Sequence, residues 1–151
     1  MSIQTIVIES PIGNLKLLAD RNQLLSVQFV DGEAYTETEH PILIRTMEQI
    51  REFFKGERTE FNLPLKIEGT AFQKEVWNAL QQIPYGETWS YQDVAQAIQR
   101  PKAVRAVGQA NKANRFPIII PCHRVIGKNK TLTGYAGKQI DKKELLLSLE
   151  K

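Results

Sequence analysis

The chain has 151 residues, of which 42% are hydrophobic and 25% are charged, as is typical of soluble globular proteins. No apolar stretch approaches the roughly 18 residues of a membrane-spanning helix, and the first residues lack the basic and apolar regions of a secretory signal. A single cysteine excludes an internal disulfide, so we expect a cytoplasmic protein with no membrane attachment.

The charge is divided unevenly along the chain. Residues 1–69 hold 7 Lys and Arg against 11 Asp and Glu, a net charge of −4. Residues 70–151 hold 13 against 6, a net charge of +7. A basic half beside an acidic half indicates that only the C-terminal half contacts a polyanion such as nucleic acid. An ordinary mixed surface explains the charge equally well.

Three short strands are predicted in the N-terminal part, over residues 5–9, 15–19 and 24–30, because apolar runs there are bounded by turn-forming residues. An amphipathic helix follows, since apolar residues recur at spacings of 4, 3 and 4: Leu43, Met47, Ile50 and Phe54. Gly56 is expected to stop this helix. The N-terminal part has no other His and no Cys that could share a metal ion with His40, so we expect it to be a histidine of a surface loop.

Residues 57–68 are expected to form a linker with a short strand near residues 61–65. Thr70 and Gln73 then match the capping box that opens a helix. Apolar residues continue this helix at helical spacing up to Pro84, where we expect it to end: Phe72, Val76, Leu80 and Ile83.

Two short helices are predicted next, from Ser90 to Ile98 and from about Lys102 to Lys112, with a break at residues 99–101. The pair suggests a helix-turn-helix, although helical hairpins are common. The second helix is slim, because small residues recur along it: Ala103, Ala106, Gly108, Ala110 and Ala113. A slim helix could fit the minor groove of DNA. The same small residues would equally suit a helix packed tightly in a core.

Cys122, the only cysteine, follows the apolar run Ile118–Ile120, which predicts a rigid, buried strand. His123 and Arg124 come directly after it. A thiolate is the nucleophilic form of cysteine, and a nearby imidazole and cation lower the pKa of a thiol. The sequence thus suggests a nucleophile, while a small core residue remains the alternative interpretation of a lone cysteine.

A glycine-bracketed loop over residues 133–137 would let its backbone approach a ligand closely. From about Ile140 a last helix is predicted, with Leu145, Leu146 and Leu149 facing inward. Together these elements predict an α+β fold. We expect a small N-terminal sheet-plus-helix domain with its linker over residues 1–68, and a mainly helical domain with a helix-turn-helix over residues 69–151.

The stretch Pro121–Val125 resembles the active-site signature of the O6-alkylguanine-DNA alkyltransferases. These repair proteins move an alkyl group from a damaged guanine onto their own cysteine. Further matching stretches extend from Gly69 to Glu150. The resemblance implies that Cys122 accepts the alkyl group, and that His123, oriented by Glu150, takes the thiol proton through a water. The thioether product has no carbonyl for water to attack, so one molecule would act once.

The resemblance also assigns residues to the DNA. Arg105 of the second helix would fill the gap left by the extruded nucleotide, and Tyr91 would help rotate that nucleotide and hydrogen-bond its base. Asn114 would link the second helix to the cysteine, although it could equally be an ordinary helix-ending residue. The base would be recognised by main-chain groups at three further residues: Val125, Tyr135 and Ala136. The family often has serine at the last of these positions.

The implied partner is double-stranded DNA containing O6-alkylguanine, bound through the minor groove by a monomer. No metal or organic cofactor is implied, and the zinc site of some alkyltransferases is not expected, because the N-terminal part has no cysteine. Three alternatives are considered. A Cys-His hydrolase would leave the helix-turn-helix without a role. A non-catalytic binder of alkylated DNA would have replaced Cys122. A transcription regulator would not need the Cys-His-Glu set.

Overall fold

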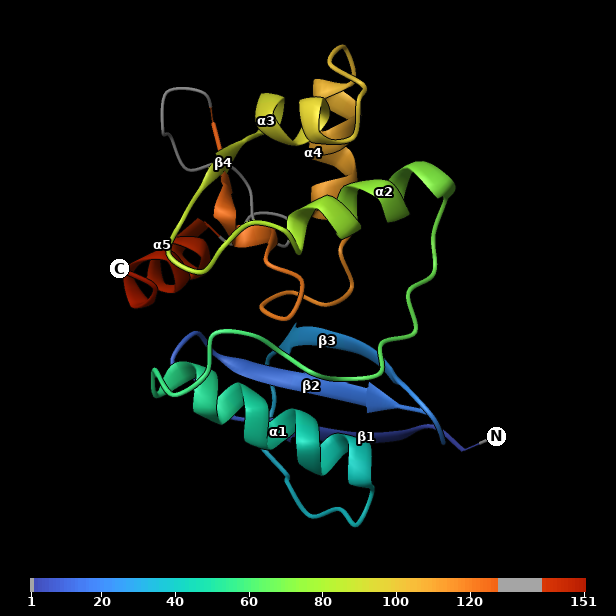
Figure 1. Cartoon of the computed structure of the whole chain (residues 1–151). Coiled ribbons are helices and arrows are strands. Elements are labelled where there is room, and N and C mark those ends of the chain that lie inside the picture. The colour runs from blue at the N-terminus through green and yellow to red at the C-terminus, as the bar shows by residue number, and fades with distance from the viewer. Residues whose placement is uncertain (1, 128–139) are drawn as a thin grey trace. The chain divides into compact units, whose positions relative to one another are not determined.

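A computed structural model describes residues 2–127 and 140–151 of the chain (Figure 1). The chain divides into two compact units, Met1–Ile67 and Glu68–Lys151. The first is a small sheet with one helix and the second is mainly helical, so the predicted α+β fold is confirmed. In these described ranges, no helix combines the length and apolar character needed to cross a bilayer.

The first unit is built on a three-stranded antiparallel sheet in the order β1-β2-β3, formed by β1 (Gln4–Ile8), β2 (Asn14–Ala19) and β3 (Leu24–Val30). Buried and half-buried residues alternate along β2, as expected where one face of a strand meets a core. Helix α1 (Pro41–Phe54) packs on this sheet (Figure 1). The three predicted strands and the helix are therefore present.

Details of α1 differ from the predicted pattern. Ile50 is buried as expected, but Phe53 takes the core position that was predicted for Phe54. Gly56 adopts a positive φ of 77° just after the C-cap Lys55, a conformation that favours glycine, so the predicted stop is confirmed. The short strand expected near residues 61–65 is reduced to a single bridge between Leu24 and Leu65.

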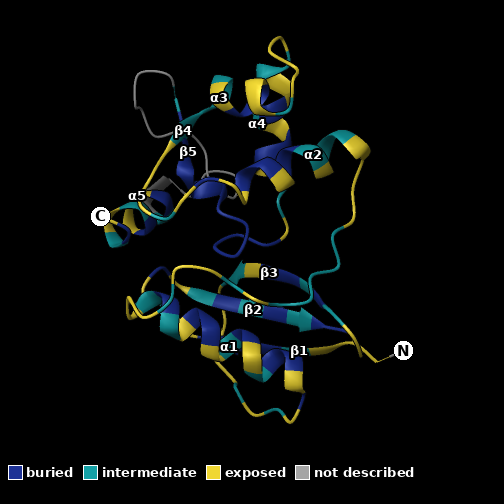
Figure 2. Ribbon diagram, in the orientation of Figure 1, coloured by how far each residue is buried: buried dark blue, intermediate teal, exposed yellow. Residues whose placement is uncertain are grey.

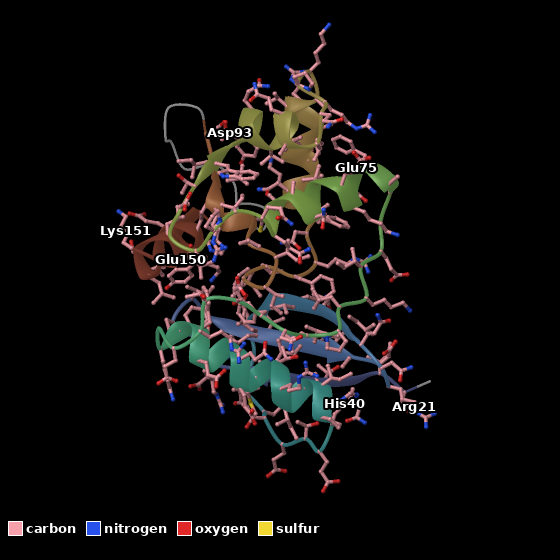
Figure 3. The ribbon with its side chains drawn as sticks, in the orientation of Figure 1. Arg21, His40, Glu75, Asp93, Glu150 and Lys151 are labelled. Atoms are coloured by element: carbon pink, nitrogen blue, oxygen red, sulfur yellow. The ribbon has the colours of Figure 1, made fainter. Side chains whose placement is uncertain are left out.

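The prediction of a surface-loop histidine at His40 is wrong. This side chain is buried and caps α1, because Nδ1 accepts a hydrogen bond from the backbone N–H of Ile42 at 3.2 Å. Nε2 lies 2.8 Å from the carbonyl oxygen of Asp20, which can only accept, so Nε2 carries the proton. A partner twenty residues away in the sequence thus decides the place of this histidine, which Figure 3 labels.

The second unit begins with α2 (Ala71–Leu80), α3 (Tyr91–Ala97) and α4 (Val104–Lys112), which pack against one another. The predicted capping box of Thr70 and Gln73 is present at the start of α2. The helix ends at Leu80 instead of continuing to Pro84, because the next turn is closed by shorter i→i−3 hydrogen bonds. The two predicted helices α3 and α4 are both found.

The strand expected to carry the cysteine is absent from residues 116–121, which form turns. Pro117 and Pro121 have no N–H to donate to a sheet, and Ile120 N–H instead donates to Phe116 O at 2.8 Å. Cys122–Arg124 then form a short 3-10 helix, η1. After it, β5 (Val125–Ile126) pairs in parallel with β4 (Trp89–Ser90). All residues from 116 to 126 are buried (Figure 2).

The last helix, α5 (Ile140–Leu149), forms as predicted, but its inward face differs. Leu146 is buried and Leu149 is half-buried, whereas Leu145 is 52% exposed. Lys143 is fully buried, as is Leu146. It shares a face with Leu146 and Glu150, three and then four residues further on. The burial of this charged residue is explained by its contacts in the active site.

Candidate active site

The turn of η1 places the cysteine. Arg124 N–H donates to Pro121 O at 3.0 Å, and Cys122 N–H donates to Ile120 O at 2.7 Å. Successive residues of a 3-10 helix are rotated by about 120°, so the side chains of Cys122 and its neighbour His123 point in different directions. Although they are adjacent in the sequence, these two side chains therefore lie in separate surroundings.

Two asparagines at the C-terminal end of α4 donate hydrogen bonds to backbone carbonyls of the cysteine turn. Asn111 donates from Nδ2 to Cys122 O at 3.4 Å, and Asn114 donates from Nδ2 to Ile120 O at 2.9 Å. The amide oxygen of Asn114 also accepts from Phe116 N–H at 2.9 Å. Asn114 thus joins the end of α4 to the turn. Asn111 does the same and was missed, because a buried polar residue inside a helix gives no local signal.

His123 is held by a carboxylate from the end of α5. Its Nε2 lies 2.7 Å from Glu150 Oε2. Arg124 binds the same carboxylate through two parallel hydrogen bonds, from Nε to Oε1 and from Nη2 to Oε2, both of 2.9 Å. The backbone N–H of Gly86 adds a fourth donor at 3.3 Å from Oε1. Glu150, labelled in Figure 3, is therefore the centre of a buried hydrogen-bonded group, with a side chain only 1% exposed.

Burial sets the protonation of the nucleophile and the base. It raises the pKa of Cys122 to about 11, against the opposing effects of a hydrogen bond from Asn114 and the charge of Lys143. Burial also lowers the pKa of His123, and this effect outweighs the hydrogen bond with Glu150. At neutral pH both groups are therefore uncharged. The expectation that neighbouring charges would lower the thiol pKa is wrong in the resting protein, because desolvation dominates.

Glu150 behaves in the opposite way. Its burial would raise the pKa of the carboxyl group, but the hydrogen bonds from His123 and Arg124 outweigh burial and lower the pKa to about 2. The carboxylate is therefore ionised at neutral pH and is paired with a guanidinium. The arrangement supplies a neutral thiol, a neutral imidazole and a fixed anion behind that imidazole, which are the parts of a proton-transfer relay.

Lys143 is a second site residue that the sequence did not reveal. Its ammonium group donates a hydrogen bond to the carbonyl oxygen of Val125, so α5 is tied to β5 just after the cysteine turn. Burial lowers the pKa of Lys143 to about 8, with an opposing effect from Cys122. The helical spacing of Lys143, Leu146 and Glu150 was the available signal, since it places the lysine on the inward face of the helix.

The residues assigned to DNA lie on α3 and α4. Tyr91 is the first residue of α3 and is half-buried, and an added Cβ on Gly108 of α4 would lie 3.9 Å from its ring. Arg105 is exposed in the first turn of α4, and Lys112 is exposed in its last turn. Within the ranges that the structure describes, no group of three or more His, Cys, Asp or Glu is arranged to hold a metal ion.

Comparisons with known proteins identify the family. The model of the 6-O-methylguanine DNA methyltransferase, ribonuclease-like domain, matches residues 3–67, and the model of the 6-O-methylguanine DNA methyltransferase, DNA binding domain, matches residues 71–151. The chain belongs to the 6-O-methylguanine DNA methyltransferase family. The constitutive methylated-DNA–protein-cysteine methyltransferase of Bacillus subtilis is 48% identical to it, over 95% of this chain and 92% of that protein.

Solved structures of this family have the same fold. The crystal structure of Mycobacterium tuberculosis O6-methylguanine methyltransferase matches with a TM-score of 0.88 and 42% identity, over 99% of this chain and 93% of that one. A crystal structure of the M. tuberculosis protein in complex with DNA matches with a TM-score of 0.86 and 44% identity, over 96% and 91%. The basic second unit is thus a DNA-binding domain of this family.

The predicted site residues fall into three groups in this family member. The structure brings together Cys122, Asn114 and Val125 around the cysteine turn, and it joins His123 to Glu150. Tyr91 opens α3 directly after Ser90, which pairs with Ile126 of β5, and Arg105 lies on α4. The last two predicted residues, Tyr135 and Ala136, lie outside the described residues.

Proposed function

We propose that this protein repairs O6-alkylguanine in double-stranded DNA by transferring the alkyl group to Cys122 in a single turnover. The observation that carries the proposal is the free thiol of Cys122 on one turn with His123, whose ring contacts the buried Glu150 at 2.7 Å. Curated relatives that are 43–48% identical to the chain are named methylated-DNA–protein-cysteine methyltransferases. The presence of the cysteine argues against a non-catalytic DNA binder.

The proton moves first in this mechanism. Cys122 gives its S–H proton to His123 through a bridging water, because the two side chains diverge from the 3-10 turn. The imidazolium that forms is stabilised by the ionised Glu150 behind it. Since the thiol and the imidazole are both neutral at rest, charge develops only as the reaction proceeds. Preorganised partners of that charge are the main means by which a buried site lowers a barrier.

The alkyl group moves in a single displacement. The sulfur of Cys122 attacks the alkyl carbon, a C–S bond forms, the bond from that carbon to O6 breaks, and its electron pair stays with the guanine. The guanine takes up one proton, which the imidazolium of His123 returns through water, and it leaves. The product is a thioether, which water does not hydrolyse, so the protein is consumed as the lesion is removed. Asn114, with its hydrogen bond to Ile120 O and its effect on the thiol, positions the nucleophile.

The DNA is proposed to bind through the minor groove, contacted by α4. An exposed Arg105 supports the wedge role, and the small residues of α4 leave a thin helix that suits a narrow groove. Tyr91 would rotate the nucleotide, and main-chain groups near Val125, Tyr135 and Ala136 would recognise the base. We further propose that the protein acts as a monomer in the cytoplasm, where a reduced thiol can meet genomic DNA.

The decisive test combines a lesion with a mass measurement. The protein is mixed with a duplex that carries one O6-methylguanine, and the intact protein is weighed and then digested to find the modified residue. We expect a gain of one methyl group per molecule, on Cys122. The matched control, Cys122→Ser, should bind the duplex and gain no mass, because phosphate contacts carry most of the affinity. Methyl transfer by this variant, or a methyl group on another residue, would refute the proposal.

A further inference from the structure

The position of Glu150 needs an explanation, because it directly follows the last helical residue of α5 and helix ends fray. Its side chain is nevertheless 1% exposed and aligned with both His123 and Arg124. The helix itself cannot fix that side chain from one end alone. Another part of the second unit must hold the end of α5 in place.

The turn that follows α2 has the required contacts. Residues 84–87 form a β-turn, closed by a hydrogen bond from Glu87 N–H to Pro84 O at 3.0 Å. Gly86 has a φ of 85°, the value that the third residue of a type II turn requires. This conformation directs its N–H to Glu150 Oε1 at 3.3 Å. The hydroxyl of Tyr85 donates to the carbonyl oxygen of Leu149 at 3.3 Å.

The same segment also contacts Arg124, the cation that shares the carboxylate of Glu150 with His123. The guanidinium carbon of Arg124 lies 5.5 Å from the centre of the Tyr85 ring, a cation–π geometry. Arg124 Nη1 donates to Ile83 O at 2.8 Å, just before the turn. One short segment therefore contacts the carboxylate, the backbone that carries it and the guanidinium that shares it with His123.

We infer that Tyr85 and Gly86 are positioning residues for the alkyl transfer, and that they fix Glu150 so that its carboxylate faces His123. The inference rests on the proposed function, because it assumes that His123 is the base. Neither residue touches the reacting atoms, and both act through Glu150. The charged groups that face His123 are Glu150 and Lys143 from the α5 segment and Arg124 from its own turn. Only Glu150 favours the imidazolium.

Gly86→Ala tests the inference with a small change. A Cβ on Gly86 would lie 3.1 Å from the backbone oxygen of Glu150, so Glu150 must move by a few tenths of an ångström. We expect alkyl transfer to free O6-benzylguanine to slow by about tenfold, the effect of weakening one hydrogen bond to a charged group. We also expect the ring of His123 to titrate at a lower pH, because its anion has moved away.

Gly56→Ala is the matched control. Gly56 also has a positive φ, of 77°, but nothing lies within 4 Å of an added Cβ there. Both variants therefore carry the same kind of backbone strain, and only one of them touches the site. The control should lower stability without changing the transfer rate or the titration of His123. Tyr85→Phe, which keeps the ring and loses the hydroxyl, should change both in the direction of Gly86→Ala, by a smaller factor.

The transfer rate and the titration of His123 together distinguish a failure of the proposed function from a failure of the positioning role. The titration of His123 is followed by NMR, and this measurement needs no alkyl transfer. Wild-type protein that fails to take up alkyl groups would contradict the proposed function. Wild-type protein that transfers normally, beside a Gly86→Ala variant with an unchanged rate and an unchanged His123 titration, would overturn the positioning role. Equal changes in Gly86→Ala and Gly56→Ala would overturn it as well.

Discussion

Replacing Glu150 by glutamine should be among the most damaging single changes in the second unit. The amide keeps the shape of the carboxylate but removes the charge that pairs with Arg124, whose side chain is 7% exposed. Breaking a buried ion pair from one side costs about 3–5 kcal/mol. The same contacts lower the pKa of Glu150 to about 2 from 4.5, a shift that corresponds to about 3 kcal/mol.

The dependence on pH provides the sharper part of the test. Because the folded-state pKa of Glu150 is depressed, its contribution to stability is fully present above about pH 4.5 and is lost as the pH falls toward about 2. Urea unfolding of both proteins at several pH values should therefore show a gap of about 3 kcal/mol at pH 7 that narrows steadily in acid. Subtracting the free energies of unfolding of the two proteins removes the contribution of the other carboxylates, because both proteins contain them.

Glu75→Gln is the control for this measurement. Glu75 pairs with Arg100 at 3.2 Å in the same unit, but both side chains are at least 40% exposed. Exposed pairs contribute at most about 1 kcal/mol, so this change should be small at every pH. The reasoning would be refuted if wild type and Glu150→Gln differed by less than about 1 kcal/mol in free energy of unfolding at pH 7. It would also be refuted if this difference did not become smaller in acid, because the buried carboxylate would then not be the source of the stability.

Two further predictions concern the DNA surface. Arg105→Ala should slow repair of a lesion in a duplex by about ten- to a hundredfold and leave reaction with free O6-benzylguanine nearly unchanged, because only the duplex requires base flipping. Measuring the rates on both substrates checks this, and equal losses on both would contradict the wedge role. Lys112→Glu and Arg115→Glu should each flatten the salt dependence of binding to undamaged duplex, by about 0.9 log unit for every phosphate that the variant no longer neutralises. Unchanged slopes in both variants would place the DNA surface elsewhere.

Local signals predicted the elements well. The capping box predicted at Thr70 and Gln73 marks the start of α2, because a cap depends only on residues three positions apart. The strands of the first sheet and the stop of α1 at Gly56 followed from equally local patterns. The fold class could thus be predicted from short stretches of sequence.

Features that depend on distant partners were missed. His40 is buried because a carbonyl at Asp20 accepts from its ring, and Lys143 is buried because Val125 offers a carbonyl to its ammonium group. The thiol pKa was misjudged for a related reason. Sequence neighbours suggested a nearby cation, whereas burial of Cys122 sets the larger effect, and burial is a property of the whole unit.

The burial of Cys122 has a consequence for how long the protein remains usable. Oxidants and soluble alkylating agents attack the thiolate, and a buried thiol with a pKa of about 11 is almost entirely protonated at neutral pH. On the proposed mechanism each molecule has a single reaction to perform, so any side reaction at the sulfur would remove it from service. Burial of the resting thiol therefore limits side reactions at the sulfur until an alkylated guanine reaches Cys122.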